Sequence, residues 1–477
     1  MPRFRELLAA FARPSMRVAL IVACAMFMQN LDSTIIVTAL PAMAHSFATN
    51  ESRVSEGITA YALAAAVCIP ASAWLAERIG ARTLFAASIG LFTLASIGCG
   101  LAGSFTVFIT ARLIQGGSAA MMSPVGRMIV LRSTEKRELM PTLSTLVWPG
   151  LLAPVIGPAL GGFITEALSW RWIFYVNVPI GVIAIALVLA VIPNHKASER
   201  TAFDGRGFLW LAAAVGCLSY GLDLLGGQHI EVPLALGLLA AAVATGYGAF
   251  RHLESTPRPL VRLAVLRNRA FRVATVSGGG LTRAAISATP FLLPMMLEVV
   301  YRLTPLQSGV LLLVYMAANL LMKTVTNPIV RRFGLRQVLI VNGAITACGI
   351  AACAWISPAL PESLIVLILL FAGASRSMQF TALMFTTFAE VSDEERAPAS
   401  VLLSLTQQIS MAAGVAGAAL ILNFTRLARH ASTFSAFDFR VALTLMAAFG
   451  ALGLVSYVTL AQDTGAEVSG HRGAALS

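Results

Sequence analysis

The hydrophobic positions of this chain fall into long apolar stretches, separated by short loops rich in Arg, Pro and Gly. Each stretch holds about 20 residues, the length that an α-helix needs to cross the hydrocarbon core of a bilayer. Helices are required, because lipid offers no hydrogen-bond partners to exposed backbone groups. Fourteen transmembrane helices are predicted, at residues 17–40, 57–77, 83–103, 105–131, 141–166, 170–192, 207–226, 232–250, 271–300, 306–330, 336–356, 362–389, 398–423 and 439–461.

Two loops share one sequence pattern, which indicates an internal duplication. The strings LAERIGAR at 75–82 and IVRRFGLR at 329–336, offset by 254 residues, each end one predicted helix, turn on a Gly and begin the next with Arg. A duplicated six-helix half accounts for this pattern. The predicted domains are a six-helix bundle at 1–200, a two-helix insert with cytoplasmic linkers at 201–262, and a second six-helix bundle with the tail at 263–477.

The composition excludes an ordinary soluble domain. Hydrophobic residues make up 57% of the chain, charged residues only 12%, and the mean hydropathy is +0.80. Soluble domains usually devote about 25% of their residues to charge. Lipid is therefore the expected solvent and the first expected partner.

The net charge of +12 does not indicate nucleic-acid binding, because the basic residues gather in alternate loops. Most lie in loops on the side of the N-terminus. The opposite loops hold only Arg53, Arg171, Arg302, Arg426, Arg429 and Arg440. The positive-inside rule then predicts a multi-pass protein of the inner (cytoplasmic) membrane with both termini in the cytoplasm. Anionic lipid headgroups account for the basicity.

The sequence offers no pattern for an enzyme, a metal site or a bound cofactor. All six cysteines lie inside predicted spans without a His partner at metal-ligand spacing, and no phosphate-binding loop or catalytic triad pattern is present. ATP is therefore not the evident energy source, and an ion gradient is expected to drive any transport.

The motifs of the first two predicted helices resemble those of a known transporter family. Residues 31–41, LDSTIIVTALP, resemble the signature of the EmrB/QacA drug:proton antiporters, the fourteen-helix group of the major facilitator superfamily. The sequence differs from the family's loop motif G-x-L-A-D-R-x-G-R-R at Ala73, Glu77 and Ala81. The motif is matched at Leu75, Ala76, Arg78, Gly80 and Arg82.

Later motifs extend the resemblance over nearly the whole chain. Arg112-Leu-Ile-Gln115-Gly116 resembles the family's buried Arg with its Gln-Gly partner, and residues 169–181 resemble the stretch that joins helices 5 and 6. The antiporter motif is matched by Gly157, Pro158, Gly161 and Gly162. Residues 121–127, MMSPVGR, are most similar to MdtD-type multidrug transporters. The resemblance implies the major facilitator fold and proton-driven export.

Four charges stand out inside the predicted spans: Asp32, Arg112, Arg283 and Arg376. Each costs at least about 2.5–3.5 kcal/mol in the membrane, so each should be paired, hydrated or functional. If the two helices of the insert are left out of the numbering, these residues lie in helices 1, 4, 7 and 10. In the superfamily that the chain resembles, those helices line the substrate cavity. Asp32 is the only carboxylate among them and is the predicted proton carrier, provided that it lies away from Arg in one state. The alternative is a fixed Asp32–Arg112 ion pair that only holds the bundle together.

The predicted substrate cavity is lined by these four residues together with Gln115, Gln379 and Gln407, although buried amides also serve as contacts between helices. Three Arg against one Asp leave a positive surplus, to which Lys323 adds. This surplus favours carboxylates or metal–carboxylate chelates over lipophilic cations, unless Arg376 and Lys323 pair with helix ends or Glu298.

A cytoplasmic gate is predicted at Glu77, Arg78, Gly80 and Arg82, where Glu77 faces the N-terminal end of the helix that begins near Pro398. The alternative is a solvated carboxylate. Gly157 and Gly161 share one helix face and allow close packing. The resemblance implies that this contact takes part in gating. The alternative is ordinary packing between helices.

The sequence thus predicts proton-coupled secondary active export of small molecules by alternating access, of the multidrug efflux type that confers drug resistance, without an enzymatic activity or a cofactor. Protons and a small-molecule substrate are its expected partners. An accessory periplasmic adaptor stays open as a partner, although no residue pattern indicates one. Two alternatives remain open: an exporter of organic anions, and a membrane sensor or assembly partner that transports nothing.

Overall fold

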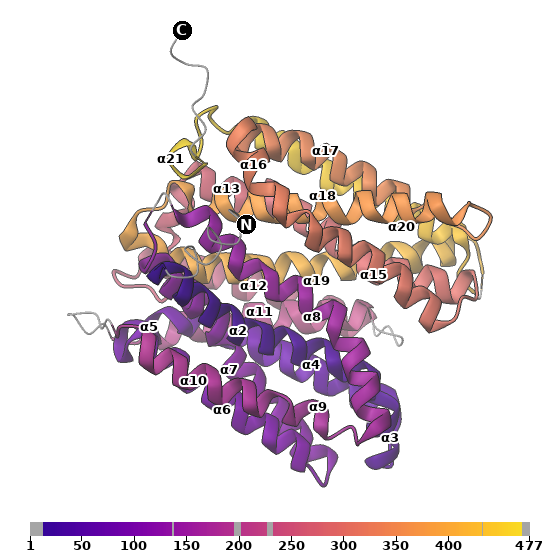
Figure 1. Ribbon diagram of the computed structural model, residues 1–477, viewed down its shortest axis with the longest axis horizontal. Helices are drawn as coiled ribbons and strands as arrows, with labels where there is room; N and C mark the ends of the chain where they lie inside the picture. The colour runs from indigo at the N-terminus through magenta and orange to yellow at the C-terminus, as the bar shows by residue number, and fades with distance from the viewer. Residues whose placement is uncertain (1–12, 136–137, 195–201, 227–231, 432, 470–477) are drawn as a thin grey trace, which may run out of the picture. The chain divides into compact units, whose positions relative to one another are not determined.

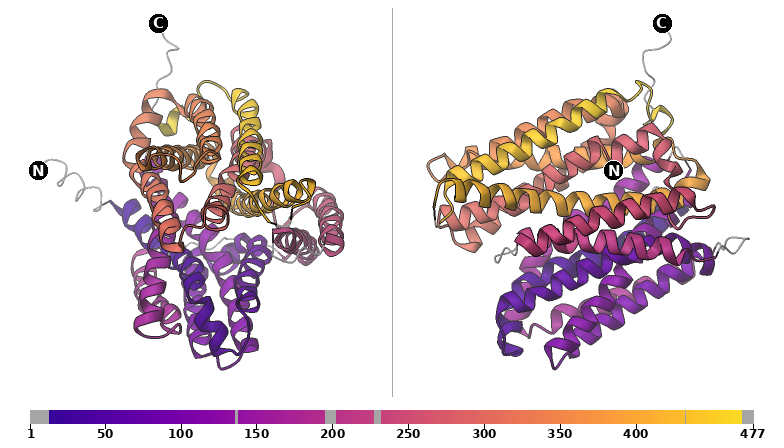
Figure 2. Two further views of the ribbon diagram at one scale, coloured as in Figure 1. Left: turned by 90° about the vertical axis from the view of Figure 1, so that its right-hand side faces the viewer. Right: turned by 180° about the vertical axis from the view of Figure 1, so that it is seen from behind.

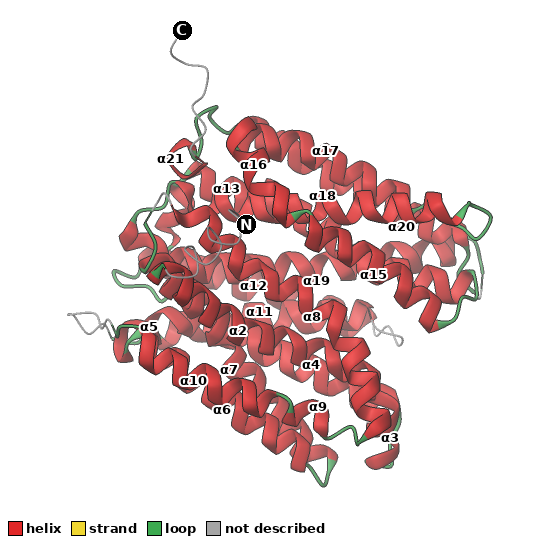
Figure 3. Cartoon of the chain, in the orientation of Figure 1, coloured by secondary structure: helices red, strands yellow, loops and turns green. Residues whose placement is uncertain are grey.

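A computed structural model of the protein describes residues 13–135, 138–194, 202–226, 232–431 and 433–469. Within these ranges the chain is helical with connecting loops, and no strand occurs (Figure 3). The all-α prediction is therefore confirmed.

The first half of the chain forms a series of long helices (Figure 1). Among its described residues, two short 3-10 turns lie between consecutive helices. Pro70 lies in one such turn, since proline removes a backbone donor. In chain order the elements are α2 (Pro14–Ile35), η1 (Ile36–Ala39), α3 (Leu40–Ser46), α4 (Glu51–Cys68), η2 (Ile69–Ala71), α5 (Ser72–Ile79), α6 (Ala81–Leu101), α7 (Phe105–Arg132), α8 (Leu139–Ala167), α9 (Trp172–Tyr175) and α10 (Asn177–Val191).

The predicted two-helix insert and the second half follow the same pattern. The insert consists of α11 (Gly205–Gly226) and α12 (Val232–Ser255). After it come η4 (Leu263–Arg267), α13 (Arg269–Thr275), α14 (Gly278–Met295), the π-helical turn η5 (Met296–Val300), α15 (Pro305–Leu321), α16 (Lys323–Phe333), α17 (Leu335–Cys353), α18 (Glu362–Ala389), η6 (Asp393–Glu395), α19 (Arg396–Ala428), α20 (Ala436–Val458) and α21 (Ala466–Ser469).

Within the described residues, ten helices are long and apolar enough to cross a membrane. The bent pair Gln307–Leu321 and Val325–Phe333 would make eleven. Helices α7, α8 and α11 occupy three further predicted ranges without being among these ten. The polytopic architecture is confirmed, and the number of fourteen spans stays a prediction.

The helices pack as two compact units. Unit 1 comprises Met1–Tyr220, Ala240–Leu263 and Ser392–Leu405. Unit 2 comprises Gly221–Leu239, Ala264–Val391 and Thr406–Ser477. The hairpin of α11 and α12 is thus divided between them, and the domain limits at residues 200 and 262 stay predictions.

In unit 1, α2 packs mainly against α8, while α7 packs against both α4 and α6. In unit 2, α15 packs against α18, and α17 packs against α18 and α20. Figure 2 shows from two further sides that the long helices within each unit run alongside one another. Such packing brings side chains from several helices to one buried point.

The two repeated loops adopt the same backbone conformation. Gly80 ends α5 at φ 92°, and Gly334 ends α16 at φ 77°. Side chains are strained at positive φ, so each turn requires a glycine. The duplicated string therefore encodes the same helix-ending turn in both halves.

Candidate functional site

Asp32 is the centre of a buried polar network in unit 1. Its side chain on α2 is wholly inaccessible to solvent and accepts three hydrogen bonds. Arg112 Nη1 donates to Oδ2 at 2.7 Å, while Gln115 Nε2 and Asn177 Nδ2 each donate to Oδ1 at 2.8 Å. Three donors, one of them charged, thus surround the carboxylate. The Asp32–Arg112 ion pair is thus formed, and a proton-carrying role for Asp32 stays a prediction.

The guanidinium of Arg112 is also wholly buried and contacts more than its carboxylate partner. Its Nε donates to the backbone oxygen of Gly57 at 3.1 Å, and its Nη1 also donates to Gln115 Oε1 at 2.6 Å. The ring of Tyr61 lies under it, with the centroid 4.4 Å from the guanidinium carbon. Nη2 has no hydrogen-bond partner among the described residues. Arg112 therefore keeps one unused donor inside the bundle.

Ser96 on α6 completes the network. Its hydroxyl oxygen accepts from Gln115 at 2.7 Å and from Asn177 at 3.2 Å. Side chains of α2, α4, α6, α7 and α10 thus meet around one carboxylate. The charge of Asp32 is balanced within this network by Arg112, and five helices hold the two groups together.

Local sequence on α7 explains how Arg112 and Gln115 reach Asp32. Residues three apart lie on the same side of a helix, so both side chains point to one place. Gly116 follows them, and a side chain there would overlap the backbone oxygen of Tyr61 on α4. The glycine therefore allows α7 to approach α4 closely enough to bury the network.

The glycines of the antiporter motif bring α8 onto α2, the helix that carries Asp32. A Cβ at Gly157 would overlap Thr34, and one at Gly161 would lie 2.6 Å from the backbone oxygen of Ile35. Thr34 also donates to the backbone oxygen of Ala153 at 3.2 Å. Gly162 has no neighbour within 4 Å of such an atom, and Pro158 is exposed. Two of the four motif residues thus make the contact.

At the predicted gate, Glu77 and Pro398 line the same small cavity of about 40 Å³. Glu77 is half-buried at the end of α5. Arg78 is exposed and lies over the ring of Trp74 at 5.2 Å, and Arg82 is half-buried at the start of α6. The structure therefore brings the carboxylate and the start of α19 to one place within unit 1, and the gating role stays a prediction.

The same cavity is lined by residues of the linkers on both sides of the insert, among them Asp204 and Arg258. Asp204 accepts from the backbone of Gly207 at 2.8 Å and of Leu260 at 3.3 Å, and His252 Nε2 lies 2.8 Å from its Oδ1. Burial raises the pKa of Asp204, but these hydrogen bonds outweigh it and hold the pKa below its ordinary value. The sequence analysis missed this carboxylate, which ties both ends of the insert together.

The predicted cavity residues of unit 2 are less tightly grouped. Arg283 on α14 is buried and donates to the backbone oxygen of Thr275 at 3.4 Å. Arg376 on α18 is half-buried, with its guanidinium carbon 5.6 Å from the ring centroid of Tyr315 and 5.7 Å from that of Phe380. Among the described residues neither arginine forms an ion pair with a carboxylate.

The two amides predicted for unit 2 differ in their surroundings. Gln379 is buried and joins α18 to α17, because it accepts from Asn342 at 2.9 Å and donates to the backbone oxygen of Leu339 at 3.3 Å. Gln407 is half-buried on α19. Gln379 thus makes the contact between helices that is the alternative to substrate binding.

Sequence reasoning missed three members of the unit 1 network: Tyr61, Ser96 and Asn177. Asn177 stands in the stretch 169–181 that carried part of the family resemblance, which is the one signal that points to it. Within the described residues no group of three or more His, Cys, Asp or Glu side chains could hold a metal ion.

Comparisons with known proteins identify the family of this chain. The model of the Major Facilitator Superfamily matches residues 22–415. The "Putative multidrug resistance protein MdtD" of Serratia proteamaculans is 34% identical over 408 residues, which cover 84% of each chain. The protein of the same name from Escherichia coli O6:H1 is 34% identical over 405 residues, covering 84% of this chain and 85% of its own. The predicted likeness to MdtD-type proteins is confirmed.

Solved structures agree on the fold. The human organic anion transporter MFSD10 (TETRAN) superimposes with a TM-score of 0.67 at 14% identity, covering 93% of this chain and 100% of its own. The proton:xylose symporter XylE gives 0.63 at 13% identity, covering 93% of this chain and 94% of its own. The motifs, the helical architecture and these matches lead to one conclusion: the chain belongs to the major facilitator superfamily and is a multi-pass membrane protein that acts as a secondary transporter.

Proposed function

We propose that the protein exports small molecules of the multidrug efflux type from the cytoplasm by alternating access, driven by the proton gradient. The observation that carries this proposal is the buried Asp32, bonded to Arg112, Gln115 and Asn177. A carboxylate is a proton acceptor, and here its charge is tied to the packing of five helices. The chain needs no cofactor and catalyses no reaction.

The proton changes the shape of unit 1 through Arg112. When Asp32 takes up a proton, the carboxylate no longer balances the guanidinium, and a buried charge that loses its partner costs about 3–5 kcal/mol. The protonated state is therefore stable only in a conformation that gives Arg112 water or another anion. At the contact with α2, α8 presents Gly157 and Gly161 without side chains of their own, so a shift of α2 need not displace a side chain of α8 at these two positions. The proton enters from outside, leaves to the cytoplasm and exchanges for substrate.

Replacement of Asp32 by Asn tests this mechanism, since the amide keeps the size of the side chain and cannot change its charge. In proteoliposomes with a pH gradient, exchange of tetraphenylphosphonium, a lipophilic cation, or carboxyfluorescein, a carboxylate, is expected to fall to the level of protein-free liposomes. Glu166→Gln is the matched control, because Glu166 is exposed near the end of α8. Exchange in Asp32→Asn equal to the wild-type rate would contradict the role of Asp32.

Organic anions are the second candidate substrates, because Arg283 and Arg376 form no ion pair among the described residues. A carboxylate would supply the missing charge, and arginine binds carboxylates through paired hydrogen bonds. Equilibrium binding of the same two probes to purified protein separates the candidates. Preference for carboxyfluorescein, lost in Arg376→Gln, favours anions, including metal–carboxylate chelates.

Placement in the inner membrane with both termini in the cytoplasm follows from the loop charges and belongs to the same proposal, as does an optional periplasmic adaptor. A protein that transports nothing and serves as a sensor or assembly partner is the remaining candidate. Absence of exchange for both probes in the wild-type protein, with and without a pH gradient, would favour it.

A further inference from the structure

Lys323 is a buried cation at a break between two helices of unit 2. It is the first residue of α16, and only 6% of it is exposed. The segments Gln307–Leu321 and Val325–Phe333 on either side of it meet at an angle of 53°. The side chain thus sits at the hinge of a bent helix pair rather than at a helix end near water, where a lysine could reach the surface.

Among the described residues, the hydrogen-bond partner of the ammonium is one hydroxyl group. Lys323 Nζ donates to Thr381 Oγ1 on α18. Thr381 gives its own proton to the backbone oxygen of Ser377 at 2.8 Å, so its oxygen is free to accept from Lys323. Within the described residues no carboxylate pairs with Lys323. An ammonium held among apolar helices by one neutral partner is costly.

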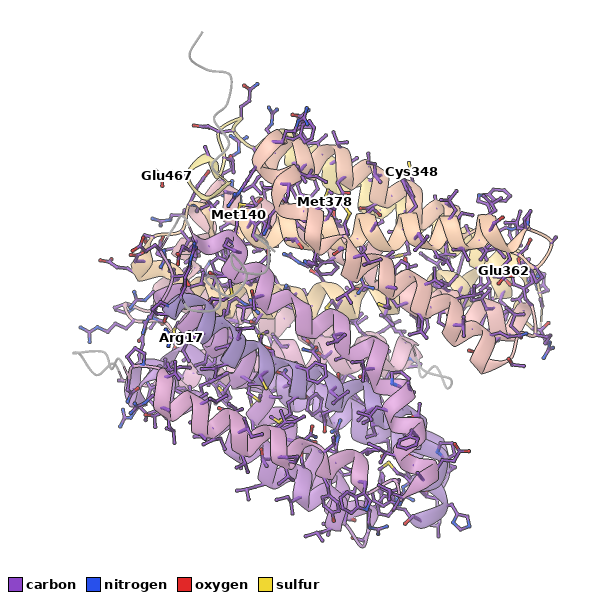
Figure 4. All side chains as sticks on the ribbon, in the orientation of Figure 1. Arg17, Met140, Cys348, Glu362, Met378 and Glu467 are labelled. Carbon is purple, nitrogen blue, oxygen red and sulfur yellow. The ribbon has the colours of Figure 1, made fainter. Side chains whose placement is uncertain are left out.

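Elements packed on α16 supply no nearby counter-charge. These elements are α15, α17 and α18, and their charged and titratable side chains are Tyr315, Arg336, Cys348, Cys353, Glu362 and Arg376. The two arginines of α16 itself lie about two turns or more beyond Lys323. Glu362 begins α18, about 28 Å along that helix from Thr381 at 1.5 Å per residue. Figure 4 shows Glu362 and Met378, which is three residues before Thr381, well apart along α18.

Two further polar side chains beside this hinge are buried without partners. Asn319 is wholly buried one turn before Lys323, and neither atom of its amide has a hydrogen-bond partner among the described residues. Ser377, one turn before Thr381, is 1% exposed, and its hydroxyl has none either. Buried polar groups normally bind protein or ordered water. These orphaned groups on α15 and α18 therefore indicate water or another polar species at the Lys323 hinge.

We propose that Lys323, with Asn319, Ser377 and Thr381 around it, forms a second proton-coupling site, located in unit 2. A buried Lys can release its proton in proteins, whereas Arg stays charged. The step transfers one proton from the ammonium to water and leaves a neutral amine that still contacts Thr381. Loss of the charge at the hinge removes the cost of the bent, buried conformation. This proposal rests on proton-coupled transport, but not on the role of Asp32.

A transport measurement tests the site through Lys323→Arg, which keeps the charge and cannot release the proton. One pH unit is a tenfold difference in proton concentration across the membrane. Each proton that is exchanged for a probe molecule can therefore raise the probe concentration ratio across the membrane by about tenfold per pH unit. Accumulation of the transported probe, tetraphenylphosphonium or carboxyfluorescein, should fall about tenfold per pH unit of gradient. Exchange of that probe without a gradient should remain measurable, which shows that the variant folds and binds the probe. Lys196→Arg is the control, because it makes the same change in the predicted linker before the insert. It should leave accumulation and exchange at their wild-type values.

A substrate-free measurement keeps the test decisive if neither probe is transported. The chain has three lysines, Lys136, Lys196 and Lys323, so the side-chain nitrogen-15 spectrum of lysine-labelled protein in liposomes has three signals. The signal that disappears in Lys323→Gln is expected to change from its charged to its neutral position before the other two signals do as pH rises. The proposal is overturned if that signal stays in its charged position up to the pH where the other two titrate, or if Lys323→Arg accumulates probe like wild type. If the wild-type protein itself exchanges neither probe, that result contradicts the proposed transport function and not the titration of Lys323.

Discussion

Asp32 shows how a single carboxylate can be recognised in a sequence while its surroundings are not. Its charge in an apolar stretch singled it out, and the structure gives it three donors from α7 and α10. Asn177, 145 residues away in the chain, carries no charge, and an uncharged amide in an apolar stretch costs too little to stand out. Gln379 is the converse case, because the amide predicted for the cavity accepts a hydrogen bond from Asn342, and its place in the cavity stays a prediction.

At this scale we expect Asn177→Ala to destabilise unit 1. The change removes hydrogen bonds to Asp32 and Ser96, and a hydrogen bond to a charged group contributes about 1.5–3 kcal/mol. The free energy of unfolding in detergent should fall by that amount. Asn423→Ala is the control, because Asn423 bonds only to the backbone of its own helix at Ala419, and it should change stability by less than about 0.5 kcal/mol. Equal losses in both variants would show that the network adds nothing.

At the scale of elements, glycine positions decide which helix faces meet. Gly161 and Gly162 are neighbours on α8, yet a Cβ at Gly161 would lie 2.6 Å from the backbone oxygen of Ile35, while one at Gly162 would have no neighbour within 4 Å. Adding a methyl group at Gly161 must push α2 and α8 apart. At Gly162 it only removes the flexibility of glycine.

We therefore expect opposite effects from two alanine substitutions one residue apart. Gly161→Ala should lower the unfolding free energy by about 1–3 kcal/mol, the usual cost of overpacking. Gly162→Ala should raise it by up to about 1 kcal/mol, because alanine favours helix over glycine. Thermal unfolding of both purified variants measures the difference. The same sign for both would mean that the α2–α8 contact is looser than the geometry indicates.

Most helices could be located from the sequence, because a bilayer requires long apolar stretches and the chain shows them plainly. Their breaks could not. The bend beside Lys323 lies about one turn before Pro328, a proline that removes the backbone hydrogen bond to residue 324, yet the apolar stretch predicted at 306–330 runs through it. Hydrophobicity alone does not distinguish a straight span from a bent one, and the unpartnered Asn319 became visible only with the packing of α15 and α18.

At the scale of the whole molecule, the repeated loop predicted two halves, and the chain does pack as two units. The segment Ser392–Leu405, however, belongs to unit 1 although it lies in the second half of the sequence. There Arg396 donates to the backbone oxygen of Leu131, at the end of α7. A hydrophobic pattern cannot show that this segment packs with unit 1, because the packing depends on contacts between residues 265 positions apart.

Asp204 gives a prediction about pH at this scale. Its folded pKa is lowered from the ordinary value of 3.8, so the stability that it gives the linkers is present above that value and is lost as pH falls through the lower, folded value. Hydrogen exchange of residues 202–210 and 256–262 should be faster in Asp204→Asn than in wild type from pH 8 down to pH 5. The difference should shrink only below the ordinary value. A difference that disappears already between pH 7 and pH 5 would contradict the role given to the Asp204 carboxylate.

The contact between Leu260 and Asp204 also bears on how such a chain can acquire or lose two helices. The backbone nitrogen of Leu260 lies 3.3 Å from a side-chain oxygen of Asp204, so the points where the hairpin leaves and rejoins the chain are adjacent. A segment whose ends meet can be excised or transplanted with little disturbance to the remainder, as in domain insertion. A short bridge from residue 204 to residue 260 would thus remove α11 and α12 and keep the two flanking segments connected.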